Sequence, residues 1–154
     1  MMNNAAHTPQ PGSLNLGMIG NCAISALIDD HARMVWCCLP RFDGDPVFNA
    51  LLQPGDQGSH FAIEIENFAS AHQWYEPNTA VLRTQLFDTD GHGVEITDFA
   101  PRFFSHSRSF RPTTLVLRVR PITGAPRTRA ALKVHYAWGQ TEPRIPPGSN
   151  PIRF

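Results

Sequence analysis

The sequence is poor in cysteine, has no excess of either charge and contains no long apolar run, and each shortage excludes a class of protein. Three cysteines are too few, and odd in number, for a disulfide framework. Basic and acidic residues balance at 13 each, so the basic excess typical of nucleic-acid-binding proteins is missing. No apolar run approaches the ~20 residues that span a bilayer. The first residues also lack the basic and apolar regions of a secretory signal, which favours a cytoplasmic location.

Motifs that carry chemistry are missing as well. The chain has no G-x-S-x-G elbow, no phosphate-binding loop and no dinucleotide fingerprint. It has seven histidines, but none of them form a pair at the spacing of a known metal site. Cys37 and Cys38 are adjacent in an expected strand and point to opposite faces, so we interpret them as buried free thiols. We therefore expect no catalytic residue, no metal and no cofactor in this chain.

What the sequence does contain is the composition of one globular domain. Its 154 residues are 42% hydrophobic and 17% charged, which is enough for a real core. The charges are divided unevenly: 12 of the acidic residues precede residue 101, and ten of the basic residues follow residue 100. The basic second part could bind anions. We favour pairing between strands of the two parts, in which acidic and basic side chains would neutralise each other.

Short apolar and alternating segments predict a mainly β protein. Residues 22–28 and 34–39 flank a five-residue polar break and predict a β-hairpin. Residues 60–68 alternate in polarity, and Asp90-Gly91 is a strong hairpin turn signal between the strands expected at 80–87 and 94–99. Further strands are expected at residues 113–122 and 129–139. The fold class predicted for residues 14–140 is an antiparallel, supersandwich-like β-sandwich.

Three segments differ from this pattern. Asp45 followed by Pro46 is a helix-start signal, and Val47 and Leu51 stand four residues apart, so we expect one short helix near residues 46–52. Residues 1–13 predict a flexible tail. Residues 141–154 are rich in proline and predict a linker or arm, after which the chain reads as truncated before a further domain.

The residues Arg41-Phe42-Asp43 stand where a strand breaks into a loop. Arg41 could hold a sugar hydroxyl or a carboxylate while Asp43 accepts a proton. Alternatively, Arg41 pairs with Asp43 or Asp45 and fixes the loop, with Phe42 as its plug. We favour this structural interpretation.

Acidic pairs and aromatic residues suggest two kinds of sugar chemistry. A glycosidase dyad needs two carboxyl groups about 5–10 Å apart. All four acidic pairs in this sequence, however, lie at expected turns or on the outward face of a strand, where acids are common. The aromatic residues near His72 could stack on sugar rings, although such residues more often belong to a core. The acidic pairs are Asp29 with Asp30, Asp43 with Asp45, Asp88 with Asp90, and Glu64 with Glu66, and the aromatic candidates are Trp74, Tyr75 and Trp138.

Two long segments resemble one enzyme family. The segment "LGMIGNCAISALIDDHARMVWCCLPRFDGDPVFNALL" is similar to the opening of bacterial glycoside hydrolase family 15 proteins, the glucoamylase and trehalase-like enzymes. "YEPNTAVLRTQLFDTDGHGVEITDFAP" resembles a later segment of the same family. The matching positions are Ile19, Gly20, Asn21, Ala26, Leu27, Trp36, Cys38, Pro40, Arg41, Phe42, Asp43, Phe48, Leu51 and Leu52 in the first segment, and Tyr75, Thr79, Leu82, Thr84, Phe87, Asp98, Phe99 and Pro101 in the second.

The sequence departs from the family pattern at three places. The usual turn glycine is replaced within residues 30–33, and Asn21 stands where aspartate is frequent. The frequent D-S-P is here Asp43-Gly44-Asp45-Pro46, which moves the proline by one position. These changes concern the roles of the loop positions and leave the expected fold as it is.

The resemblance implies a division of labour. In that family the amino-terminal domain is a β-sandwich, and the catalytic glutamates belong to a following (α/α)6 barrel. It implies that Arg41, Phe42, Asp43 and Trp36 form an interface or pocket-shaping loop facing that barrel. The implied function is the non-catalytic amino-terminal domain of an inverting glycoside hydrolase acting on α-glucosides such as trehalose, maltose or malto-oligosaccharides. The alternatives are a free-standing carbohydrate-binding sandwich and an oligomerisation module, and unpaired sheet edges would favour a homodimer.

Overall fold

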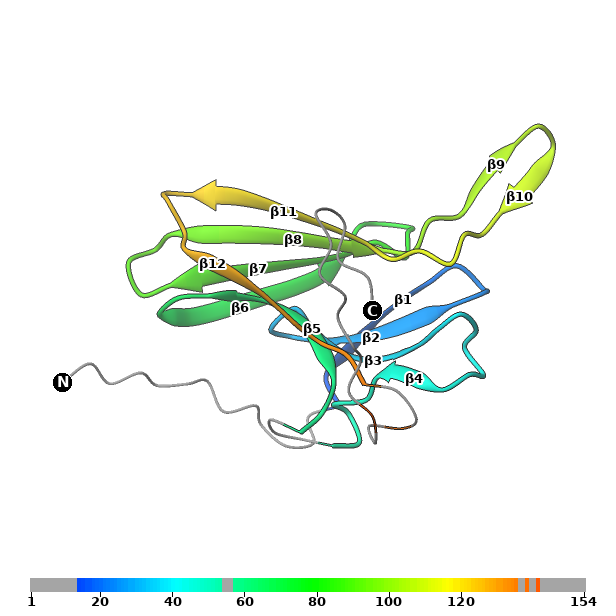
Figure 1. Cartoon of the computed structure of the whole chain (residues 1–154). Coiled ribbons are helices and arrows are strands. Elements are labelled where there is room, and N and C mark those ends of the chain that lie inside the picture. The colour runs from blue at the N-terminus through cyan, green and yellow to red at the C-terminus, as the bar shows by residue number, and fades with distance from the viewer. Residues whose placement is uncertain (1–13, 54–56, 136–137, 139–140, 142–154) are drawn as a thin grey trace, which may run out of the picture.

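The computed structural model describes residues 14–53, 57–135, 138 and 141, and they form two facing antiparallel sheets with a separate hairpin (Figure 1). The predicted tail at 1–13 and almost all of the predicted linker at 141–154 lie outside these residues. The first sheet has the order β1 (Leu16–Gly20), β2 (Ser25–Asp29), β3 (Arg33–Cys38), β5 (His60–Ile65) and β12 (Thr128–Lys133), and β4 (Pro46–Phe48) also pairs with β3. The second sheet has the order β11 (Val116–Thr123), β8 (Gly93–Phe99), β7 (Leu82–Asp88) and β6 (Phe68–Tyr75).

The core lies between the two sheets, as the alternating pattern requires. One buried cluster joins Ile19 and Met34 of the first sheet to Leu82 of the second, and another joins Ile63 to Ile96. The prediction of a mainly β, antiparallel sandwich is therefore confirmed.

Both hairpins expected from the sequence are present. β2 and β3 pair around the polar break, and β7 and β8 pair around Asp90-Gly91. Gly91 has a φ of 81°, a conformation that glycine adopts without the steric cost of a side chain. Of the free cysteines, Cys37 and Cys38 are buried, and burial raises the pKa of the Cys37 thiol to about 12. The interpretation of this pair as buried free thiols is confirmed.

The predicted helix near residues 46–52 is wrong. Pro46–Phe48 is strand β4, in which Phe48 lies opposite Cys37 and reaches the core, and a turn follows from Asn49. The helix signal at Asp45-Pro46 was local, and the free edge of β3 offered these residues a sheet partner and a buried position for Phe48. Tertiary pairing has overridden a weak local preference.

The expected strand at 60–68 is divided, and besides β4 three further strands, β6, β9 (Phe103–Ser105) and β10 (Arg108–Phe110), were not predicted. β5 ends at Ile65, and Glu66 and Asn67, the latter with a φ of 52°, form the turn into β6. β9 and β10 form a two-stranded hairpin that projects beyond both sheets (Figure 1). We call residues 103–110 the arm.

Two sheet edges carry features that oppose pairing with another chain. The Tyr75 hydroxyl accepts a hydrogen bond from the Met18 amide at 2.6 Å and donates one to the Met18 carbonyl at 2.9 Å, which satisfies the middle of edge strand β1. Edge strand β11 contains exposed Arg118 and Arg120 followed by Pro121 at a register shift. Charge, proline and bulges are the usual protections of an edge. The homodimer through sheet edges stays a prediction, and the edges β1 and β11 do not favour it.

Candidate domain interface

One end of the sandwich gathers four connections, among them the predicted Arg41-Phe42-Asp43 loop. These are residues 21–24, 39–45, 76–81 and 100–115, which we call the loop end. Because Cys37 lies opposite Ala26, the loop after β3 leaves the sheet at the same end as the β1–β2 connection. Figure 1 shows this end, from which the arm projects, on the right of the molecule.

The Arg41-Phe42-Asp43 loop contains its own ion pair. Arg41 donates from Nε and Nη2 to the two carboxylate oxygens of Asp43, at 2.8 Å each. The Arg41 guanidinium holds the pKa of the Asp43 carboxyl below its ordinary value, so the pair is charged at neutral pH. Both side chains are mostly exposed, and Phe42 is 64% exposed. The predicted ion pair is present, but Phe42 points outward and does not plug the loop.

Trp36, the fourth residue predicted for this interface, lies on β3 and contacts Trp138, with ring centroids 6.3 Å apart. This contact places both tryptophans at the first sheet. The structure therefore does not bring Trp36 into the Arg41 loop itself, although the two follow one another along the chain.

The buried side chain of Asn21 connects the β1–β2 connection to the two ends of the arm. Sequence reasoning gave this residue no role. Its Oδ1 accepts hydrogen bonds from the amides of Ala23 and Ile24, which shapes the β1–β2 connection. Its Nδ2 donates to the carbonyls of Pro101 and Pro112 at 3.0 and 2.9 Å. These carbonyls flank the arm, so one side chain fixes both of its roots. An aspartate could not donate these two bonds, which gives a physical reason for asparagine at this position.

A hollow of about 570 Å³ lies beside Asn21 at the loop end. Its wall is mostly apolar, and Arg102 and the exposed Cys22 provide its polar groups, with Arg102 Nη1 3.5 Å from the Cys22 sulfur. The hollow is bounded by the connections of both sheets and by the first residue of the arm. It can receive an apolar group from a neighbouring surface.

The three aromatic residues proposed for sugar stacking are in different places. Trp74 faces outward from the second sheet, in register with Arg83 and beside His72, with ring centroids 4.9 Å apart. Tyr75, the next residue, points to the other face of β6 and binds Met18. Trp138 contacts Trp36. The three residues therefore do not form one surface. Of the three, Trp74 alone belongs to the outer face of the second sheet.

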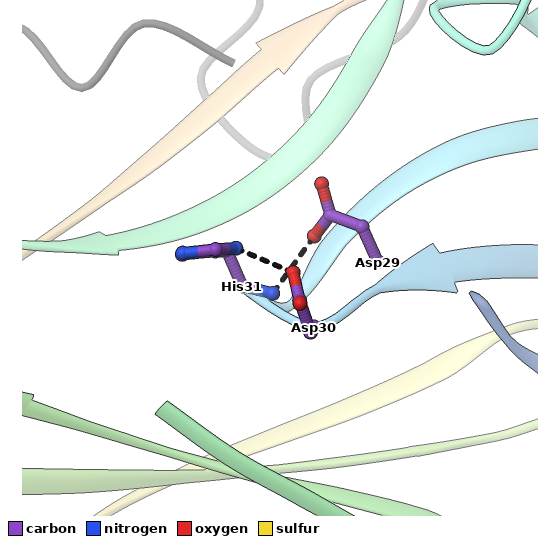
Figure 2. Close-up of side chains that lie close together, drawn as sticks. All are labelled: Asp29, Asp30 and His31. Atoms are coloured by element: carbon purple, nitrogen blue, oxygen red, sulfur yellow. Dashed lines mark hydrogen bonds and ion pairs between the residues drawn. The ribbon is translucent and has the colours of Figure 1, made fainter. Parts of the chain in front are cut away.

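The acidic pairs mainly stabilise turns. In Figure 2, the β2–β3 turn brings together the side chains of Asp29, Asp30 and His31. Asp29 Oδ1 accepts hydrogen bonds from the amides of His31 and Arg33 at 3.0 and 2.9 Å. Asp30 Oδ1 lies 2.6 Å from His31 Nδ1. Burial raises the pKa of Asp29, although these two amides act in the opposite direction.

The turn between β7 and β8 repeats this arrangement. Asp88 Oδ1 accepts the amides of Asp90 and His92, and its other oxygen lies 3.1 Å from His92 Nδ1. Each of the two clusters has three potential ligand atoms within 4.8 Å of one another, which is a spacing that a cation accepts. Hydrogen bonds from backbone amides already account for the positions of Asp29 and Asp88. We therefore assign both clusters to turn capping.

A family model with the description "Trehalase-like, N-terminal" matches residues 10–153, which include both sheets and the loop end. The chain belongs to this family. Trehalase 1 and trehalase 2 of Sulfolobus acidocaldarius are 37% and 33% identical to it over 92 and 88 residues, or 58% and 57% of this chain. The trehalase of Thermoplasma volcanium is 31% identical over 87 residues, or 55% of this chain.

These matches cover only 14% to 15% of the length of the trehalases. No solved structure gives a significant match. Among the residues that the structure describes, there is no helix with the length and apolar character needed to cross a membrane.

In this trehalase-like N-terminal domain, one buried acid has no partner. Asp98 of β8 is 1% exposed, and neither carboxylate oxygen hydrogen-bonds to any described residue. It lies between Leu82 of β7 and Leu117 of β11, on the face that packs against the first sheet. Burial raises the pKa of Asp98 to about 7. The sequence marked Asp98 only as a match to the resembled family, and nothing in its neighbours indicated burial without a partner.

Proposed function

We propose that this chain is the non-catalytic amino-terminal domain of a cytoplasmic, inverting glycoside hydrolase of the family 15 kind, acting on α-glucosides. In this proposal the loop end packs against an (α/α)6 catalytic domain and shapes its surface. Membership of the trehalase-like N-terminal family and the similarity to a small part of three trehalases support it.

The observation that carries the proposal is the solvent exposure of the Phe42 side chain. A phenylalanine that is 64% exposed gains little from its position in the isolated domain. The loop that holds it contains the bidentate Arg41–Asp43 pair and a turn in which the Gly44 amide donates to the Arg41 carbonyl. An exposed aromatic residue on a loop at the same end of the sandwich as an apolar hollow is an arrangement that suits an interface anchor.

The contacts and burial of four acids fit the proposal that catalysis belongs to another domain. Inverting hydrolysis needs a protonated acid and a separate carboxylate on opposite sides of the sugar. Asp43 is held by Arg41, Glu64 accepts from Arg129, and buried Glu95 accepts from Arg83 and Arg120. These acids are engaged in ion pairs, and Asp98 is closed off from solvent in the core.

The proposal is tested by binding to the catalytic segment of the parent enzyme, produced as a separate chain. We expect a one-to-one complex by light scattering, and we expect Phe42→Ser to weaken it at least tenfold. Because Phe42 is exposed, this substitution should leave the unfolding midpoint of the domain unchanged, and denaturation checks this. A parent gene with no helical catalytic segment, or a catalytic segment that ignores the domain, would refute the proposal.

A free-standing carbohydrate-binding function is the competing candidate, and Trp74 beside His72 is the feature that would serve it. Titration of the chain with maltoheptaose and trehalose, followed by tryptophan fluorescence, separates the two functions. The proposed function predicts no saturable change. Saturable binding that is lost in Trp74→Ala would favour the competing candidate.

A further inference from the structure

The arm displays more apolar surface than a free surface hairpin needs. Phe103, Phe104 and Phe110 are 50%, 76% and 41% exposed, and all three belong to two strands of three residues. Phe103 lies opposite Phe110 in the register and shares its face, and Phe104 is on the other face, so both faces of the arm expose apolar surface. Exposed apolar surface of this kind on a soluble domain is a common mark of an interaction site. Phenylalanine and arginine are also among the residues enriched in interfaces.

The direction of the arm is fixed from its base to its tip. Asn21 holds the carbonyls of Pro101 and Pro112, on either side of the arm. Along the arm, the rings of Phe103 and Phe110 stack at 5.4 Å with an interplanar angle of 13°. At the tip, His106 and Ser107 have φ values of 48° and 60°, as a two-residue hairpin turn requires. These contacts define the direction in which the arm leaves the sandwich and the geometry of its turn.

The arm nevertheless has little of its own to stabilise it. A two-stranded hairpin is marginal in water, and strands of three residues give it few cross-strand contacts. Figure 1 shows the arm extending away from both sheets, so the core does not cover it. A surface outside the two sheets would bury the phenylalanines and supply the missing stabilisation.

The charge of the arm indicates the chemistry of that surface. Arg102, Arg108 and Arg111 lie in or beside the arm, and the sequence has no acid between Asp98 and Glu142. Within the described part of the chain, none of these three arginines forms an ion pair with a carboxylate. A docking surface that complements them is apolar at its centre and acidic at its rim.

We propose that the arm docks into an apolar groove with an acidic rim on the catalytic domain of the parent enzyme, with Phe104 as its central anchor. This rests on the proposed function and adds a second contact, separate from the Arg41-Phe42-Asp43 loop. A protein groove fits better than a nucleic acid for two reasons. The chain has no net charge, and Phe103 and Phe110 already stack on each other, which occupies one face of each ring.

The test measures binding of the 154-residue chain to the separately produced catalytic segment. Phe104→Ser and Arg108→Glu are each expected to weaken binding more than tenfold. Raising the salt concentration should weaken the wild type more than Arg108→Ala, because the arginine contributes by charge. Leu52→Ser is the matched control, since Leu52 is 62% exposed and lies outside the arm. Unfolding midpoints check that all variants remain folded.

Each outcome decides a different point. Binding that is weakened by Phe42→Ser but unchanged by both arm substitutions would overturn the arm proposal and leave the proposed function standing. Absence of binding by the wild type would contradict both. Self-association abolished by Phe104→Ser would show that the arm binds a second copy. Binding of an oligonucleotide abolished by Arg108→Glu would show a nucleic-acid partner, and either result would overturn the assignment.

Discussion

Replacing Asn21 by aspartate is expected to lower the free energy of unfolding by about 4 kcal/mol, the sum of several lost or inverted buried hydrogen bonds. The new oxygen would face the carbonyls of Pro101 and Pro112, where Asn21 now donates at 3.0 and 2.9 Å. The repulsion would either detach the roots of the arm or force a proton onto the buried carboxyl. Denaturant unfolding measures the loss.

A second measurement locates the damage. Trypsin should cleave the Asn21→Asp variant faster at Arg102 and Arg108, because the arm is no longer held at its base. Asn78→Asp is the control: Asn78 is exposed in a turn with a φ of 59°, which aspartate also tolerates. An Asn21→Asp domain as stable as the wild type would show that the Asn21 bonds do not hold the loop end together.

Asp98 is expected to make the domain less stable as the pH rises from about 4 to about 7. In the folded state burial raises the pKa of Asp98 from 3.8 to about 7, so between these values the folded state holds a proton that the unfolded state has lost. The folded state thus binds more protons, and the free energy of unfolding falls with pH across this window. The difference of about three pKa units corresponds to roughly 4 kcal/mol.

Asp98→Asn separates this contribution from those of the other acids. Below pH 4 both forms are neutral at this position, and above pH 7 only the wild type carries the buried charge. We therefore expect the stability of Asp98→Asn relative to wild type to increase by roughly 4 kcal/mol between pH 4 and pH 7. Asp98→Leu, which also cannot ionise, should show the same trend. Parallel pH profiles for the wild type and both variants would mean that Asp98 has a partner or solvent access.

The parts of the fold that were predictable have strong local signals. Asp90-Gly91 fixes a hairpin because glycine accepts its positive φ, and the alternation of Phe61, Ile63 and Ile65 fits one buried face of a strand. β4 was missed because the choice between helix and strand depended on the free edge of β3, which lies outside the local sequence. β6 was missed because its polar residues, such as Gln73, bind across the sandwich to Asp29.

The candidate site was predictable only in part. The Arg41–Asp43 pair followed from two opposite charges two residues apart, and the structure contains it. The anchoring by Asn21 joins residues 80 and 91 positions apart, so no local pattern could show it. The arm was hidden because "FFSHSRSF" has neither a turn glycine nor a proline, although His106 and Ser107 adopt the conformation of a turn.

The central claim is that this domain assists an α-glucosidase without reacting itself, and glucose release tests it most directly. The 154-residue chain is incubated with trehalose and with maltose, alone and together with the separately produced catalytic segment. We predict no glucose from the chain alone, and a higher activity or thermal stability of the segment when the chain is added. Glucose release by the chain alone would contradict the account, once a mock purification has excluded a contaminating enzyme.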